Sequence, residues 1–260
     1  MALDSVRSAV LQNPTDVGLF FDFDGTLSPI QDDPDSVVPL PGVVASIETL
    51  AAHVGVVAIV SGRPVSFLEP FFTDDRVQLS GLYGIEGRVD GNAHVDPAAK
   101  EWLPIIADAA ASASEAFGGE VVEDKTYSLT VHYRGQPAEV VDRVREWATS
   151  ISSSTGLEAR DAKQSVEVHP PSLGTKGDAV ERILGPLPIA AYFGDDIGDL
   201  PAFERLASLV EDSSLTEIAN VLVAGPETPD ALRTIATDVV DGPGYVRDQL
   251  IDLAAALTAS

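Results

Sequence analysis

The chain has 260 residues, of which 45% are hydrophobic and none is cysteine, and its 41 Asp and Glu outnumber its 16 Lys and Arg to give a formal net charge of −25. The apolar fraction is sufficient for one large domain or two smaller ones, and the lack of cysteine excludes disulfides, thiolate metal sites and cysteine nucleophiles. The acidity disfavours nucleic acids and anionic membranes as partners, because their phosphates would be repelled.

Two features of the sequence bear on its location in the cell. The segment from Met1 to Pro14 lacks the apolar core of a signal peptide. No run of about 18 apolar residues is available to span a bilayer. These features predict a cytoplasmic protein without membrane or nucleic-acid partners, and we expect a monomer.

The first predicted strand is the apolar run Val17 to Phe21, which leads into two carboxylates, Asp22 and Asp24, and a Gly25-Thr26 turn. In an open α/β sheet, ligands bind at the carboxyl ends of the strands. Two anions this close together are tolerated when a cation or a shared proton offsets their repulsion. The stretch therefore predicts a hard metal ion at the end of a buried strand.

A second strand is predicted after a proline-rich loop (28–41) and a helix that begins near Gly42. This strand, Val54 to Val60, ends at Ser61-Gly62-Arg63-Pro64, and Pro64 suits the first turn of the next helix. The three elements form a βαβ unit, so both polar turns should face the same crevice.

The pattern changes after a third short strand, Val77 to Leu79, and a hairpin, Ile85 to Val95. From Pro97 the spacing predicts two helices (102–113 and 140–151) and strands at 121–133, near 157–160 and at 165–168, with 121–133 as a single alternating strand. This order of elements predicts a small α+β module, residues 97–171, inserted into a larger α/β domain formed by residues 1–96 and 172–260.

The last part of the chain returns to the first pattern. Lys176 opens a helix, and the buried strand Ile189 to Phe193 ends in Gly194-Asp195-Asp196 with Asp199 close behind. This is a third polar turn at a strand end. A helix at 202–207, a strand at 221–224 and a helix at 245–257 should complete the domain.

The polar strand ends carry a resemblance that covers the whole chain. In order, Asp22-Phe23-Asp24-Gly25-Thr26, Ser61, Lys176 and Gly194-Asp195-Asp196 with Asp199 resemble the four motifs of the haloacid dehalogenase superfamily of phosphatases. The resemblance implies a Rossmann-like α/β core with a parallel sheet and an inserted α+β cap of type 2, a lid that selects the substrate.

The resemblance also implies roles for these residues. Asp22 would be the nucleophile, since a carboxylate needs no deprotonation, and Asp24 would be the general acid and base. Mg²⁺ would be held by Asp22, the backbone carbonyl of Asp24 and Asp195, because it prefers hard oxygen ligands. The remaining implied roles are phosphate binding for Ser61, Gly62 and Lys176, and orientation of the metal's waters for Asp196 and Asp199.

Four further segments are similar to signatures of trehalose-6-phosphate phosphatases: Gly81-Leu82-Tyr83-Gly84-Ile85-Glu86, Glu123-Asp124-Lys125, Val131-His132-Tyr133-Arg134 and Glu167-Val168-His169-Pro170. The similarity implies that Gly81, Glu123, Lys125, Arg134 and Glu167 form the sugar site. Many relatives have His-Gly where this chain has Tyr83-Gly84. Strict alternation also places Glu123 and Lys125 opposite His132 and Arg134, so a bulge or a turn near Asp124 is needed if all four are to reach one ligand.

Several alternatives stay open. Arg63 could contact phosphate or pair with a carboxylate, Asp199 could favour the start of the next helix, and a lone histidine such as His132 is more often structural than a ligand. We expect a Mg²⁺-dependent trehalose-phosphatase that works through an aspartyl phosphate. The alternative substrates are sucrose 6-phosphate, a glucosyl- or mannosyl-phosphoglycerate and a pseudosugar phosphate. A phosphoaspartate receiver module is a distant alternative, because a receiver has no use for an inserted lid.

Overall fold

The computed structural model describes residues 1–31, 33, 36–162, 164–171, 174–225 and 228–259. The chain forms two compact units, Met1–His94 with Gly174–Ser260 and Val95–Leu173. We call them the core unit and the inserted unit and describe each by itself. No helix among the described residues has the length and apolar content needed to cross a membrane.

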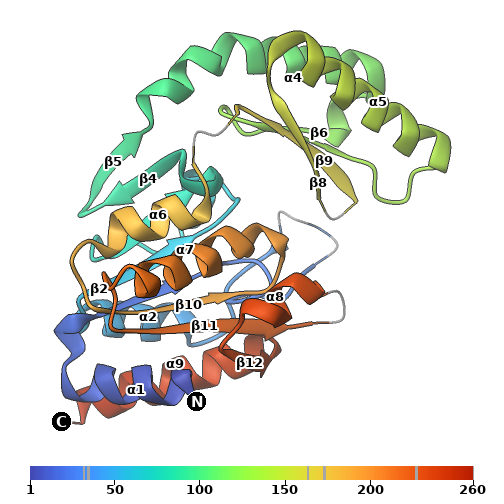
Figure 1. Ribbon diagram of the computed structural model, residues 1–260. Coiled ribbons are helices and arrows are strands. Elements are labelled where there is room, and N and C mark those ends of the chain that lie inside the picture. The colour runs from blue at the N-terminus through green and yellow to red at the C-terminus, as the bar shows by residue number, and fades with distance from the viewer. Residues whose placement is uncertain (32, 34–35, 163, 172–173, 226–227, 260) are drawn as a thin grey trace. The chain divides into compact units, whose positions relative to one another are not determined.

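The core unit is built on an eight-stranded sheet in the order β12-β11-β10-β1-β2-β3-β4-β5 (Figure 1). Strands from β12 to β3 run parallel to their neighbours, whereas β4 is antiparallel to β3. All five residues of β1 are buried, as expected for an apolar strand covered on both faces. The predicted parallel α/β fold is confirmed. The strands are β1 (Val17–Phe21), β2 (Val56–Val60), β3 (Val77–Gly81), β4 (Glu86–Val89), β5 (Asn92–Val95), β10 (Ile189–Gly194), β11 (Glu217–Ala224) and β12 (Asp238–Asp241).

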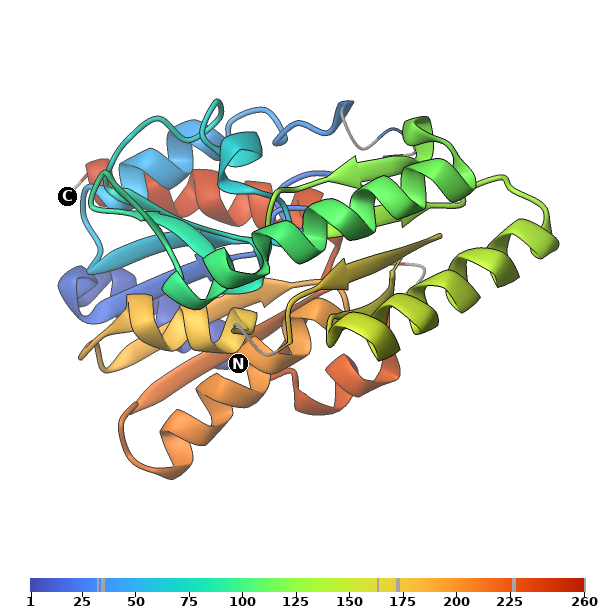
Figure 2. The same ribbon diagram turned by 90° about the horizontal axis from the view of Figure 1, so that it is seen from above.

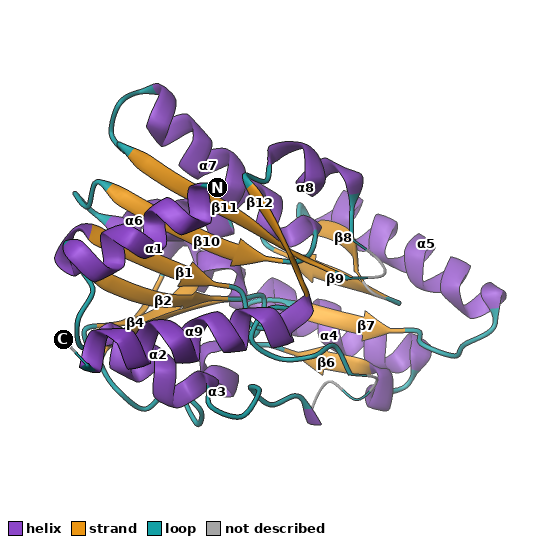
Figure 3. Cartoon of the chain, turned by 90° about the horizontal axis from the view of Figure 1, so that it is seen from below, coloured by secondary structure: helices purple, strands orange, loops and turns teal. Residues whose placement is uncertain are grey.

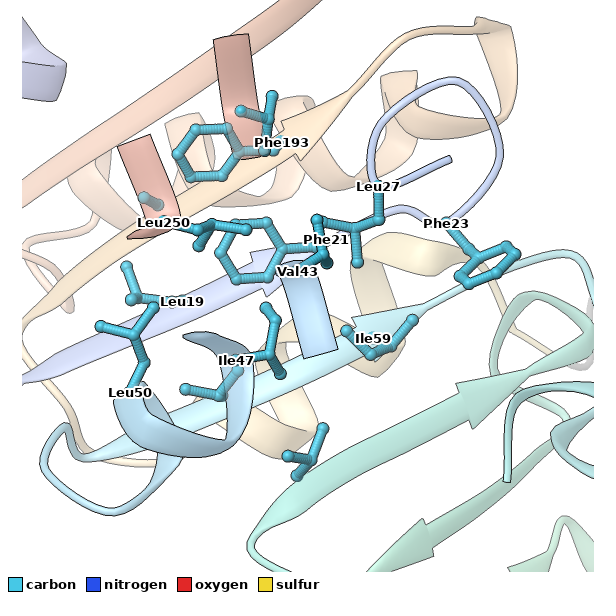
Figure 4. Packing of buried hydrophobic residues seen from close by; sticks show 14 of the residues in the cluster. Leu19, Phe21, Phe23, Leu27, Val43, Ile47, Leu50, Ile59, Phe193 and Leu250 are labelled. Atoms are coloured by element: carbon cyan, nitrogen blue, oxygen red, sulfur yellow. The ribbon is translucent and has the colours of Figure 1, made fainter. Parts of the chain in front are cut away.

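Helices cover both faces of this sheet. Phe21 packs into the cluster formed with α1, α2 and α9 (Figure 4). Its neighbour Phe20 packs into the cluster formed with α6, α7 and α8, the helices that Figure 3 labels. Figure 2 shows α6 and α7 side by side in yellow and orange. Full burial of a phenylalanine side chain contributes about 1.5–3 kcal/mol, so these alternating residues hold the three layers together. The helices are α1 (Ala2–Gln12), α2 (Val43–Ala51), α3 (Val65–Leu68), α6 (Lys176–Leu184), α7 (Leu200–Glu211), α8 (Asp230–Ile235) and α9 (Gly242–Thr258).

The inserted unit is a four-stranded sheet in the order β6-β7-β9-β8 with two helices packed on one face (Figure 1). Val131 and Val166, which pair across β7 and β9, belong to the apolar cluster under these helices. Thr130 and Glu167 also pair across these strands and point to the opposite face, because side chains alternate along a strand. The elements are α4 (Leu103–Phe117), β6 (Val122–Asp124), β7 (Leu129–His132), α5 (Ala138–Thr155), β8 (Glu158–Ala162) and β9 (Ser165–His169).

The prediction of one strand over 121–133 is wrong. Strand β6 ends at Asp124, and the chain turns back before β7 begins at Leu129. The Asp124 carboxylate accepts a hydrogen bond from the Thr126 N–H at 2.8 Å, and Thr126 has a φ of 70°. An aspartate that bonds to the backbone two residues on is typical of a turn, and here it outweighs the alternating pattern.

Other differences concern element ends and short elements. Helices α1 and α8 and strand β12 were not predicted, and β11 begins at Glu217, four residues before the predicted start at Val221. Helix α1 carries Leu3, Val6 and Val10 at helical spacing and buries the two valines in the core. Pro64 lies just before α3 and not in its first turn.

Candidate active site

The carboxyl ends of β1, β2 and β10 meet at one edge of the core sheet. These three strands are parallel neighbours, with β1 between β10 and β2. Asp22, Ser61 and Asp195 directly follow them, and the Asp22 N–H donates to the Phe193 carbonyl at 2.8 Å. The edge therefore brings the three predicted polar turns together.

Lys176 joins this group from the first turn of α6. Its Nζ lies 2.7 Å from Asp22 Oδ1 and 2.7 Å from Asp199 Oδ1, and all three side chains are buried. The helix begins there because Thr175 and Asp178 form a capping box, in which each side chain accepts a hydrogen bond from the backbone of the other residue. The cap thus fixes the point at which the lysine enters the site.

Asp199 is the anchor of the loop that follows β10. Its Oδ1 accepts from Lys176 and from the Tyr192 hydroxyl at 2.7 Å, and its Oδ2 accepts from the N–H groups of Asp195 at 2.8 Å and Asp196 at 3.1 Å. Sequence reasoning missed Tyr192. The signal was present, because a tyrosine inside a buried strand must find a partner for its hydroxyl.

The charges of the cluster are strongly coupled. Burial raises the pKa of Asp22 well above its usual value, Lys176 opposes this, and the carboxylates of Asp199 and Asp195 add to the rise. Burial lowers the pKa of Lys176, but Asp199 and Asp22 more than offset this, so its pKa lies well above the usual value. The carboxylates outnumber the one lysine, which leaves an anionic pocket suited to a cation.

Three carboxylates of the site could bind a metal ion. Asp22, Asp195 and Asp199 offer oxygen atoms that all lie within 4.8 Å of one another. Both Asp199 oxygens already accept hydrogen bonds from other groups of the site, so this carboxylate is occupied in holding the loop and the lysine. At Gly25 an added Cβ would lie 2.2 Å from Asp195 Oδ2, so only glycine lets the loop after β1 approach this carboxylate. An all-oxygen donor set suits a hard divalent cation.

Asp24 is paired with Arg63. The guanidinium binds both carboxylate oxygens, Nε to Oδ2 and Nη2 to Oδ1, each at 2.9 Å, and it lies 4.3 Å from the centre of the Phe67 ring. Of the two roles left open for Arg63, the structure therefore has the carboxylate pair. A bidentate contact fixes the direction in which the Asp24 carboxyl group points.

The turn after β2 and the acidic loop are held by local contacts. Ser61 Oγ is buried and accepts from the Arg63 N–H at 3.1 Å, while Asp196 Oδ1 accepts from the Gly198 N–H at 2.8 Å. An added Cβ at Gly81 would lie 2.7 Å from the Val65 nitrogen. The glycine at position 81 is thus required by close backbone packing against the turn after β2.

In the inserted unit, the predicted sugar residues lie on or near the polar face of the sheet. Thr130 pairs with Glu123 and Glu167, so both glutamates share its face, and the Glu123 carboxylate lies 3.0 Å from His132 Nε2. The turn at 125–128 explains how Glu123 and His132 come to one face. Arg134 is exposed just beyond the end of β7.

Glu167 is the buried centre of this face. It accepts hydrogen bonds from Arg160 at 3.0 Å, Ser128 at 3.4 Å and Lys125 at 3.5 Å. Burial alone would raise the pKa of Glu167. The positive charges of Lys125 and Arg160 lower it by more, so the pKa lies below its usual value. Sequence reasoning missed Arg160, and only the β8–β9 register reveals it, because that register pairs it with Glu167.

Comparison with known proteins gives consistent matches. A family model described as trehalose-phosphatase matches residues 20–230. The trehalose-phosphate phosphatase of Mycobacterium ulcerans is 33% identical over 199 residues, which cover 72% of this chain and 51% of that protein. That of Mycobacterium leprae is 30% identical over 256 residues, covering 92% and 58%. The chain thus spans about half the length of the curated relatives it matches.

Solved structures share the fold. The C-terminal domain of trehalose-6-phosphate phosphatase from C. albicans superposes with a TM-score of 0.78 at 23% identity, covering 96% of both chains. A trehalose-6-phosphate phosphatase related protein gives a TM-score of 0.78 at 20% identity, covering 93% of this chain and 99% of the other. At such identities the likeness shows the fold alone.

Proposed function

The chain belongs to the trehalose-phosphatase family, and from this premise we propose that it is a Mg²⁺-dependent phosphatase that hydrolyses trehalose 6-phosphate to trehalose and phosphate. The observation that carries the proposal is the meeting of Asp22, Ser61, Lys176 and Asp195 at one edge of the core sheet in a chain that matches the family over most of its length. A cytoplasmic monomer without nucleic-acid or membrane partners stays a prediction from the sequence.

The proposed reaction has two displacements at phosphorus. In the first, an Asp22 oxygen attacks the phosphorus, the bond to the sugar oxygen breaks, and Asp24 donates a proton to that oxygen. In the second, water attacks the phosphorus of the aspartyl phosphate and gives a proton to Asp24, while the bond to Asp22 breaks. The bidentate contact with Arg63 would orient Asp24 for both proton transfers.

The neighbouring residues would stabilise the charge of the phosphoryl group. Lys176, Ser61 and the Gly62 backbone would bind its oxygens, because Lys176 Nζ already lies beside Asp22 Oδ1. Mg²⁺, held by Asp22, Asp195 and the Asp24 carbonyl, would supply further positive charge to these oxygens. Asp196 and Asp199 would orient the groups that bind the ion and the phosphate. Asp199 would do so by holding Lys176 and the 195–196 backbone.

The sugar would be recognised by Glu123, Lys125, Arg134 and Glu167, with Gly81 shaping the turn after β2. Charged groups on one face of a sheet can hydrogen-bond to several hydroxyls at once. Since Glu167 is buried and already accepts bonds from Lys125 and Arg160, its part would be to hold these two cations.

The test is phosphate release by the purified chain from a panel of esters with Mg²⁺ present. The panel contains trehalose 6-phosphate, sucrose 6-phosphate, glucosyl- and mannosyl-phosphoglycerate, a pseudosugar phosphate and p-nitrophenyl phosphate. We expect kcat/KM for trehalose 6-phosphate to exceed that for the aryl ester by about 100-fold or more, because a site built for hydroxyls rejects esters without them. A preference for another sugar phosphate would reassign the substrate, and equal rates would refute the assignment.

The same assay tests the metal and the receiver alternative. EDTA should abolish turnover and added Mg²⁺ should restore it. A chain that accumulates aspartyl phosphate without turnover would be a receiver and not a phosphatase.

A further inference from the structure

The segment after β3, Gly81 to Glu86, contacts the turn that carries Ser61. The Tyr83 N–H donates to the Ser61 carbonyl at 3.1 Å, and the Leu82 N–H donates to the Arg63 carbonyl at 3.0 Å. The Glu86 carboxylate accepts from the Val65 N–H at 2.6 Å. Three hydrogen bonds therefore hold the whole turn after β2 against this segment.

The Tyr83 ring lies next to two loops of the site. An added Cβ at Gly62 would lie 2.7 Å from both Cζ and Oη of Tyr83, so glycine is needed for the ring to sit there. An added Cβ at Gly198 would lie 3.4 Å from Cε1 of the same ring, within van der Waals distance. Gly62 follows Ser61, and Gly198 precedes Asp199, so the ring packs closely against the phosphate turn and lies beside the acidic loop, where a single added carbon at 198 would reach it.

The backbone of Tyr83 is strained to achieve this. Its φ is 59° and its ψ is 27°, and the preceding Leu82 has a φ of 50°. A bulky residue rarely adopts this left-handed conformation, and it persists only where the surroundings determine it strongly. Such strain is found mainly at functional sites.

We propose that Tyr83 is a positioning residue for phosphate transfer: its ring sets the spacing between the Ser61–Gly62 turn and the Asp195–Asp199 loop. The inference rests on the proposed function, which assigns phosphate binding to the first loop and metal binding to the second. Both loops act on groups that every phosphate ester shares. Loss of the ring should therefore slow all substrates alike, because a shift of about 1 Å in a reacting group can cost about 100-fold in rate.

The test compares three variants, Tyr83→Phe, Tyr83→Asn and Tyr83→Gly, by kcat and KM on trehalose 6-phosphate and p-nitrophenyl phosphate. Asparagine and glycine both tolerate the left-handed conformation, so these two variants remove the ring without adding strain. We expect Tyr83→Phe to keep kcat within about threefold of the wild type. The other two should lose about 100-fold in kcat on both esters while thermal unfolding shows a folded chain.

Glu123→Ala is the matched control, because it should affect the sugar phosphate and spare the aryl ester. Folded Asn and Gly variants with kcat within about threefold of the wild type would overturn the inference. So would a loss confined to trehalose 6-phosphate, which would put Tyr83 in the sugar site, or a Phe variant as impaired as the Asn variant, which would assign the effect to the hydroxyl. Failure of both the Asn and Gly variants to fold would leave Tyr83 a structural role alone and would overturn it too.

A binding measurement separates this inference from the proposed function. If the wild type released phosphate from no ester, the proposed function would fail. The positioning role of Tyr83 would then be tested by the affinity for inorganic phosphate, measured by calorimetric titration with Mg²⁺ present. We expect affinity to fall about tenfold in Tyr83→Asn and to stay unchanged in Tyr83→Phe. Equal affinities in both variants would refute the positioning role.

Discussion

At the scale of single residues, Lys176 is the charge that makes the carboxylate cluster possible. Its ammonium group bridges Asp22 and Asp199, each at 2.7 Å, and all three groups are buried. A buried carboxylate without such a partner would protonate rather than remain charged. The lysine thus opposes the rise that burial causes in the Asp22 pKa and favours the anionic form of this carboxyl group.

The variant Asp22→Asn tests the nucleophile. We expect turnover to fall by at least about 10³-fold, because an amide oxygen does not displace the sugar oxygen from phosphorus. Folding should be retained, since the asparagine oxygen can still accept from Lys176. Activity is measured by phosphate release and folding by thermal unfolding, and retention of a tenth of the activity would reject the role.

Glu167→Gln tests the buried centre of the inserted unit. The pKa of Glu167 is lowered from 4.5 in the folded state, so its contribution to stability is fully present above about pH 4.5 and disappears as the pH falls through the folded pKa. We expect the variant to unfold with about 1–3 kcal/mol less free energy at neutral pH, and this difference should shrink on acidification.

Urea unfolding followed by tryptophan fluorescence reports on the inserted unit, because both tryptophans of the chain, Trp102 and Trp147, lie in it. Glu158→Gln is the control, since Glu158 is exposed on the neighbouring strand β8. A difference that grows toward low pH would contradict the assigned ion pairs.

At the scale of elements, the start of α6 and its packing on α7 determine where Lys176 lies. The capping box of Thr175 and Asp178 places the N-cap one residue before the lysine, so the helix begins at Lys176. Gly177 then lets the two helices approach, since an added Cβ there would lie 2.4 Å from the Pro201 carbonyl oxygen of α7. A backbone oxygen cannot move aside as a flexible side chain can, so any side chain at 177 must push the helices apart.

Gly177→Ala should therefore destabilise the core unit by about 1–3 kcal/mol, as expected for overpacking. Gly244→Ala is the matched control: Gly244 also lies in the first turn of a helix, but no atom outside its neighbours lies within 4 Å of an added Cβ. Alanine there should be neutral or stabilising by up to about 1 kcal/mol. Thermal unfolding measured by circular dichroism compares the two, and equal melting temperatures would contradict the close helix contact.

At the scale of the whole molecule, the excess of acidic residues dominates. A formal net charge of −25 makes the folded chain repel itself, and dissolved salt screens this repulsion beyond a Debye length of about 10 Å at 0.1 M. The carboxylates of the anionic pocket contribute to this repulsion. A cation bound there would stabilise the folded state in addition to the general screening by salt.

Raising NaCl from about 10 mM to about 300 mM should increase Tm by a few degrees, because screening relieves the repulsion in the folded state. Mg²⁺ at matched ionic strength should raise Tm further in the wild type, because an ion that binds only the folded site would stabilise it, and should do so less in Asp195→Asn. A Tm that is flat or falls with NaCl would contradict the role of net charge, and equal Mg²⁺ effects in both proteins would contradict the metal ligand.

Much of the core could be predicted because its signals are local. The run Val17 to Phe21 is a buried strand for the reason that the sequence suggests, and the same holds for Ile189 to Phe193. The hairpin at 125–128 could not be predicted by alternation, since the residues on either side keep the pattern of a single strand. Helix α1 was missed although Leu3, Val6 and Val10 recur at helical spacing, so its signal was present in the sequence.

Local patterns in the amino-acid sequence are enough to identify the residues that end the strands. Apolar runs and the polar residues that stop them are neighbours in the chain, so Asp22, Ser61 and Asp195 could be placed at strand ends without coordinates. The partners of these side chains depend on the three-dimensional fold: Arg63 binds Asp24, Tyr192 binds Asp199, Arg160 binds Glu167, and the Tyr83 ring packs at Gly62 and beside Gly198. These contacts join side chains from different elements, and their existence depends on distances and directions that no local pattern encodes.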